Sequence, residues 1–215
     1  MTRPLWPHTG EGRTVARLVR LGCCLVAVGA TAAVAAGIAS SGDPGRKLRE
    51  GGWILALLLA SYLFGFVAVT SPRCAAGGRV LLTAAAAGLA TIAVAALLVV
   101  VAPPVPAGVG PAVLVVALGS VGAAALVQHR HGDRAAVLAG LLTATVSSLG
   151  IVMLVDVVAT VGAPELIPAL VPLSLPPATQ LAESRIELVD PYLGLLLLGA
   201  VAAATLGVRA IRAAR

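Results

Sequence analysis

Long apolar stretches separated by short polar ones dominate the hydropathy pattern of this chain. Each stretch holds enough uncharged residues for an α-helix to cross a hydrocarbon core of about 30 Å, which takes about 20 residues. We therefore expect an all-α fold, a polytopic membrane helix bundle whose single domain covers residues 21–215, after a cytoplasmic N-terminal segment of residues 1–20. The pattern predicts six spans, over residues 21–40, 51–70, 80–102, 110–128, 135–161 and 191–208.

Proline and capping residues mark several of the predicted helix ends. A cluster at Pro103, Pro104 and Pro106 separates the third span from the fourth, because proline removes a backbone donor and clashes with the preceding turn. Asp190 followed by Pro191 predicts the start of the sixth span, with aspartate as the N-cap and proline at the first helical position.

The first apolar stretch has two interpretations. Basic residues before it and small residues after it would suit a cleaved signal peptide. Its apolar core is longer than the about 7–15 residues of a signal peptide, which favours a retained first helix.

Composition agrees with a membrane protein. Hydrophobic residues make up 59% of the chain and charged residues 11%, whereas a soluble domain has about 25% charged residues. The net charge is +6. Most basic residues lie in the segments that the six spans put on the same side of the membrane as the N-terminus, and the exceptions are Arg46, Lys47, Arg49 and Arg185. This bias predicts a plasma-membrane protein with both termini in the cytoplasm. The segments between spans are too short for a basic domain, so we expect the lipid bilayer, and not nucleic acid, as a partner.

The segment between the fifth and sixth spans is unusual. Its prolines recur every four residues, at Pro164, Pro168, Pro172 and Pro176. An α-helix does not carry this pattern, because each ring clashes with the carbonyl four residues back. We expect residues 164–177 to form an irregular strap on the outer end of the bundle, as a lid or a partner-docking surface. A stiff linker is the simpler alternative. Residues 179–189 then predict a short amphipathic helix.

Asp156 is the only carboxylate within an apolar stretch. An ionisable residue inside a membrane suggests a functional site, because burying its charge is costly. It lies about 30 Å along the fifth span, near the outer interface. Helical spacing places it on one face with Thr145, Ser148 and Thr160, which predicts a polar face at an outward-facing cavity. Alternatively, Asp156 caps a neighbouring helix or pairs with Arg185.

The predicted outer region is acidic. Its candidate functional or partner-binding residues are Asp156, Glu165, Glu183, Arg185, Glu187 and Asp190. Such a region gathers cations or meets a basic partner, although a solvated acidic face is the simpler interpretation. We expect no metal site and no cofactor, since His129 and His131 stand in a basic turn with no cysteine or third histidine nearby in sequence.

Small residues recur at four-residue spacing in three spans. They are Gly29, Ala33 and Gly37 in the first, Gly140, Ala144 and Ser148 in the fifth, and Gly199, Ala203 and Gly207 in the sixth. Such faces let helices approach closely, within one chain or between copies. A sequence this rich in alanine and glycine also produces the pattern by chance.

No catalytic motif accompanies these features. The chain has no phosphate-binding loop, HExxH or GxSxG sequence, so we do not expect an enzyme. The leading hypothesis is a non-catalytic accessory or structural subunit that acts through its extracytoplasmic face and helix surfaces, on other membrane subunits or as a homo-oligomer. The alternative is a small transporter or channel-like permease with a pathway ending near Asp156.

Overall fold

The structure, a computed structural model, describes residues 10–39, 44–71, 74, 77–101, 109–162, 164, 167, 170, 174 and 176–213. Within these residues the chain forms six α-helices and no strand, which confirms the predicted all-α fold and helix number. The helices are α1 (Gly10–Ala39), α2 (Pro44–Val69), α3 (Gly78–Val101), α4 (Val109–His129), α5 (Asp133–Val161) and α6 (Pro177–Ala213).

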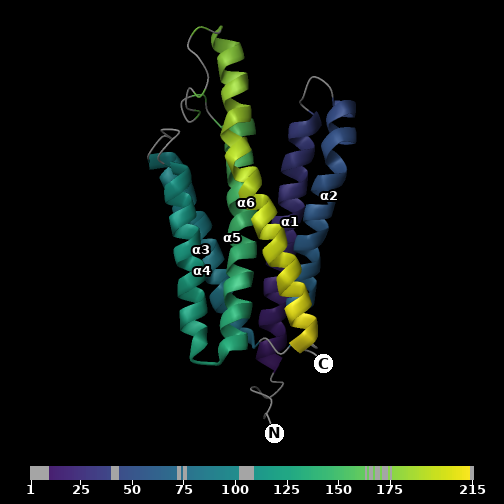
Figure 1. Ribbon diagram of the computed structural model, residues 1–215, viewed down its shortest axis with the longest axis vertical. Coiled ribbons are helices and arrows are strands. Elements are labelled where there is room, and N and C mark those ends of the chain that lie inside the picture. The colour runs from purple at the N-terminus through teal and green to yellow at the C-terminus, as the bar shows by residue number, and fades with distance from the viewer. Residues whose placement is uncertain are drawn as a thin grey trace.

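The six helices run along the long axis of the molecule in alternating directions (Figure 1). The start of α1, the turn between α4 and α5, and the end of α6 lie at one end, which we call the proximal end. The end of α5 and the start of α6 lie at the opposite, distal end. The central helix is α5, which packs against α1, α3, α4 and α6, while α2 packs mainly against α6.

Four helical segments of the described chain are long and apolar enough to cross a membrane. They are Gly78–Leu98, Ala112–His129, Asp133–Val161 and Pro177–Arg212, and Trp53–Val69 is a shorter apolar segment. Large apolar side chains point outward on these helices, such as Leu118 at 71% and Leu126 at 73% exposure on α4. Outward-facing leucine suits contact with lipid, so these helices indicate a membrane protein.

Close packing of small residues joins α2, α5 and α6. A Cβ atom on Gly65 of α2 would lie only 2.5 Å from the carbonyl oxygen of Ala203 in α6. A Cβ atom on Gly199 would lie 2.5 Å from Cβ of Ser148 in α5. At the same level the hydroxyl of Tyr62, which is fully buried, donates to the carbonyl oxygen of Leu196 at 2.9 Å. The small-residue face predicted for the sixth span is thus a helix-packing face within the chain.

The other two small-residue faces make looser contacts. A Cβ atom on Gly140 would meet Val121 and Ala125 of α4 at 3.6 Å, and one on Gly29 would meet Sδ of Met153 at 3.2 Å. The side chain of Ala33 and the surroundings of Gly37 lie outside the described part of the structure.

Hydroxyl groups on α5 are bonded to backbone carbonyls. Thr143 donates to the carbonyl oxygen of Ala84 in α3 at 3.2 Å, and Thr145 donates to that of Leu141 in its own helix at 2.7 Å. A hydroxyl buried in an apolar interior needs such a partner, because leaving it unpaired costs about 1–3 kcal/mol. These bonds let α5 carry polar residues through the core of the bundle.

The prediction for the start of the sixth helix is wrong. Instead of a short amphipathic helix over residues 179–189 and a new start at Asp190 and Pro191, one 37-residue helix runs through both. Pro191 removes one helical hydrogen bond, but Ser184 and Tyr192 on either side are buried. Packing on both sides of the proline therefore outweighs its local preference.

The helix begins instead at Pro177, the N-terminal position that proline favours. With a length of about 55 Å, α6 exceeds a hydrocarbon core of about 30 Å. Its first turns extend past the distal ends of the other helices (Figure 1).

Candidate functional site

The distal end of the molecule carries a projection. We define the distal projection as residues 177–189 of α6 together with the described strap residues Pro164, Ile167, Leu170, Ser174 and Pro176. None of these strap residues is in an α-helix, and the amide of Ile167 donates to the carbonyl oxygen of Pro164 at 3.1 Å in a tight turn. The described strap residues thus agree with the irregular conformation predicted from the proline spacing, although the helix starts at Pro177, where the strap was expected to end.

The strap is attached to α6. The amide of Leu170 donates to Oγ of Ser184 at 3.2 Å, and Ser184 is 1% exposed. Ile167 is also buried, at 8% exposure. These two anchors hold the described strap residues against the molecule.

Arg185 links the projection to the end of α5. Its guanidinium donates from Nη1 to the carbonyl oxygen of Thr160 at 2.7 Å, and from Nη2 to that of Gly162 at 3.0 Å. The last carbonyls of a helix lack intrahelical donors, and a cation there also complements the helix dipole. The predicted pairing of Arg185 with Asp156 is not among the ion pairs of the described residues.

Glu183 and Glu187 are both exposed, one helical turn apart on α6. Two other acidic residues of the predicted outer region are not described: Glu165 lies outside the described residues, and so does the side chain of Asp190. The described part of the chain contains no group of three or more histidine, cysteine or acidic residues placed to hold a metal ion.

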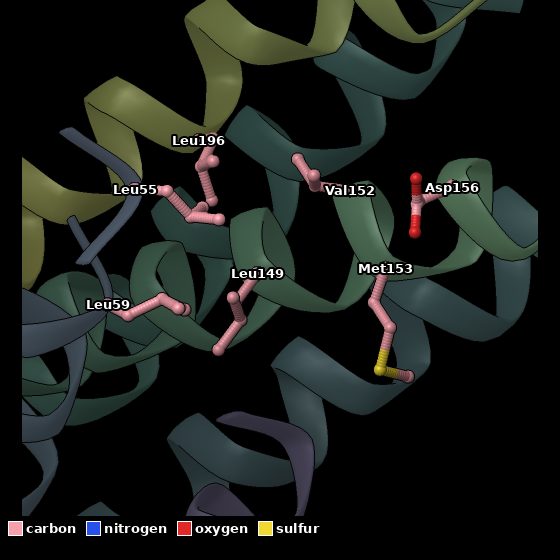
Figure 2. Close-up of a pocket in the computed structure, with 7 residues that line it drawn as sticks. All are labelled: Leu55, Leu59, Leu149, Val152, Met153, Asp156 and Leu196. Carbon is pink, nitrogen blue, oxygen red and sulfur yellow. The ribbon is translucent and has the colours of Figure 1, made fainter. Parts of the chain in front are cut away.

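A small cavity lies between α2, α5 and α6. Its volume is about 20 Å³, and its lining is Leu55, Leu59, Leu149, Val152, Met153, Asp156 and Leu196 (Figure 2). Asp156 contributes the only charged side chain, and the other side chains are apolar. A volume of this size holds about one water molecule.

Asp156 has an unusual environment for a carboxylate. The residue is partly buried, and its Oδ2 atom is shielded from solvent without a hydrogen-bond partner in the described structure. Its carboxylate stands at one edge of the set of lining residues, beside Val152 and Met153 (Figure 2). It lies about 8 Å along the helix from Val161, the last residue of α5.

The predicted polar face of α5 does not form one continuous lining. Ser148 is buried beside Gly199, and Thr145 is buried with its hydroxyl bonded within α5. Thr160 is exposed, and its hydroxyl donates to the carbonyl oxygen of Asp156 at 2.8 Å. Among the predicted polar residues of this face, Asp156 lines the cavity, together with Val152, which lies between Ser148 and Asp156 on the same face.

The histidines lie at the proximal end, away from this region. His129 and His131 are exposed in the turn between α4 and α5, and Nδ1 of His129 lies 3.1 Å from Oδ1 of Asp133. Gly132 in this turn has a φ of 108°, a conformation that glycine adopts without strain.

Sequence reasoning missed Tyr62 and the leucines of α2. The hydrogen bond of Tyr62 to Leu196 and the cavity shared by Leu55, Leu59 and Asp156 bring together residues far apart in the chain. Only one signal pointed to them, which is the small-residue face of α6 that lets α2 approach.

The chain was compared with models of protein families, with curated proteins and with solved structures, and it matches none of them.

Proposed function

We propose that the protein is a non-catalytic accessory or structural subunit of the plasma membrane, and that it binds its partner through the distal projection. The observation that carries this proposal is the continuous α6, which extends beyond the length needed to cross a bilayer. A span that serves only to cross the membrane has no need of these additional turns. The partner is another membrane protein or a second copy of this chain.

The hydrogen bonds of the projection support a binding role. Leu170 is tied to Ser184, and Arg185 is tied to Thr160 and Gly162. A surface that is ordered before binding loses less conformational entropy when the partner docks. The projection thus has the property of a preformed interface.

Charge and topology indicate the kind of partner surface. Glu183 and Glu187 present two exposed carboxylates, which attract a basic surface. The arginine bias of the sequence favours an orientation with the proximal end in the cytoplasm and the projection outside. A partner with a basic extracytoplasmic segment therefore fits this surface.

The interior favours a subunit over the alternative permease. The cavity at Asp156 measures about 20 Å³, room for one water molecule and not for a cargo molecule. The hydroxyls of Thr143 and Thr145 are bonded to backbone carbonyls, so they do not line an open polar path.

Site-specific photo-crosslinking in native membranes tests the proposal. A photoreactive amino acid replaces Glu183 or Glu187, and a matched control carries it at Leu118, a lipid-facing position of α4. We expect a discrete protein adduct at positions 183 and 187, identified by mass spectrometry, and lipid adducts at position 118. Lipid or solvent adducts alone at all three positions would contradict a role for the projection in partner binding.

A further inference from the structure

One oxygen of the Asp156 carboxylate lacks a hydrogen-bond partner inside an apolar helix of the described structure. This atom, Oδ2, is buried. Buried polar atoms are usually satisfied, and ionisable residues within membrane spans usually pair with one another or serve a function. The described bundle therefore leaves the Oδ2 atom of Asp156 without a hydrogen-bond donor.

The described basic side chains do not fill this role. Arg185 lies at the end of α5, and its guanidinium already donates to the carbonyl oxygens of Thr160 and Gly162. The other described basic side chains lie towards the proximal end, in the first turns of α1 and α3, in the turn between α4 and α5, and in the last turns of α6. The described side chains, which do not include those of Arg46, Lys47 and Arg49, thus supply no donor for this oxygen of Asp156.

The cavity restricts what that donor is. A metal ion such as Ca²⁺ takes several oxygen ligands, whereas the lining supplies one carboxylate among six apolar side chains. A free organic cation does not fit in about 20 Å³. A lysine or arginine side chain does not need to enter the cavity, because its apolar stem lies along the hydrophobic helix surface while its charged head reaches the accessible edge of the partly buried carboxylate.

We propose that Asp156 binds a lysine or arginine side chain carried by a transmembrane helix of the partner subunit. This inference rests on the proposed function and adds a second contact, within the membrane, to the distal projection. Asp156 is only partly buried, so a side chain from a neighbouring helix can approach it from the surface. Polar contacts of this kind contribute to helix association in lipid.

A probe helix tests the chemistry of the site directly. The probe is a single-span leucine and alanine helix with one lysine at the depth of Asp156, and a second probe has leucine there instead. A photoreactive amino acid at Val157, which is 40% exposed, reports capture in the membrane. We expect the lysine probe to be captured about fivefold more than the leucine probe, a preference of the size that single polar contacts give in membranes.

Three variants make the result specific. Asp156→Asn keeps the size of the side chain and should reduce capture of the lysine probe to that of the leucine probe. Asp156→Glu should retain the preference. Asp133→Asn removes a carboxylate at the other end of α5, where it is 88% exposed, and should leave capture unchanged. Equal capture of both probes by the wild type, or capture unaffected by Asp156→Asn in protein that elutes normally in gel filtration, would overturn the proposal.

Co-purification from native membranes separates this inference from the proposed function. If Asp156→Asn loses the partner that wild type retains, the inference holds for the native complex. If the adduct at position 183 persists and Asp156→Asn retains the partner as well as wild type, the inference is wrong and the proposed function stands. If position 183 yields no partner but the lysine probe is captured through Asp156, the proposed function is wrong and the preference of the site for a basic helix stands.

Discussion

Gly199→Ala tests the packing that joins α2, α5 and α6. The new Cβ atom would lie 2.5 Å from Cβ of Ser148 and would also overlap the hydroxyl of Tyr62. Carbon atoms in contact prefer about 3.5–4.0 Å, so α6 has to move away from α5 by about 1 Å. That movement also breaks the hydrogen bond from Tyr62 to Leu196, which is 2.9 Å long in the wild type.

The size of the effect follows from three contributions. Overpacking a filled interior costs about 1–3 kcal/mol, and the lost hydrogen bond costs about 1 kcal/mol. Alanine recovers up to about 1 kcal/mol through its higher helix propensity than glycine. We expect Gly199→Ala to lower the free energy of unfolding by about 2 kcal/mol.

The assay is equilibrium unfolding in detergent micelles with a double-mutant cycle. Tyr62→Phe alone should cost about 1 kcal/mol, and it should cost almost nothing in the Gly199→Ala background, where the hydrogen bond is already broken. Gly194→Ala is the matched control, because Gly194 lies on the same helix and a Cβ atom there would meet nothing within 4 Å. Equal stability of Gly199→Ala and Gly194→Ala, or additive effects in the cycle, would refute this account of the packing.

Two further predictions concern arginines that hold helix ends. Arg185→Gln removes the donors to the carbonyl oxygens of Thr160 and Gly162. Hydrogen–deuterium exchange of the backbone amides at the end of α5 should then be faster by about fivefold. An unchanged exchange rate would contradict the role of Arg185. Arg20 of α1 donates to Oγ1 of Thr70 at 2.9 Å and to its carbonyl oxygen at 2.7 Å at the end of α2. Arg20→Lys retains the charge but not the two hydrogen bonds of the guanidinium, so the free energy of unfolding, followed by thermal unfolding, should fall by about 1 kcal/mol. A variant as stable as the wild type would show that the charge alone is sufficient.

The hydropathy pattern predicted the helix bounds well for the helices that are apolar over almost their whole length. The third, fourth and fifth predicted spans match α3, α4 and α5 to within a few residues. α1 and α2 begin earlier than the first two predicted spans, because a helix continues into polar residues while hydropathy records only the apolar part. At Pro191 the sequence predicted a helix start where α6 is continuous, because packing on both sides stabilises the helix through a residue that favours a helix start.

The candidate site was predictable only in part. Asp156 stands out in the sequence because a charge within an apolar stretch is rare. Its neighbours Leu55, Leu59 and Leu196 resemble every other leucine of the chain, so the sequence gives no sign that they meet at one cavity. Pairing of Arg185 with Asp156 was one of the alternatives that the sequence offered, but the bonds of Arg185 to the last carbonyls of α5 depend on where that helix ends.

The central claim is that the chain crosses the membrane with the distal projection outside and the proximal end in the cytoplasm. Cysteine labelling tests it most directly, in a background where Cys23, Cys24 and Cys74 are replaced by alanine. The two reporters are Glu183→Cys on the projection and His131→Cys in the α4–α5 turn, both at exposed positions. A membrane-impermeant maleimide should label position 183 in intact cells and position 131 only after the membrane is opened. Labelling of position 131 in intact cells, or of position 183 only after opening, would contradict the claim.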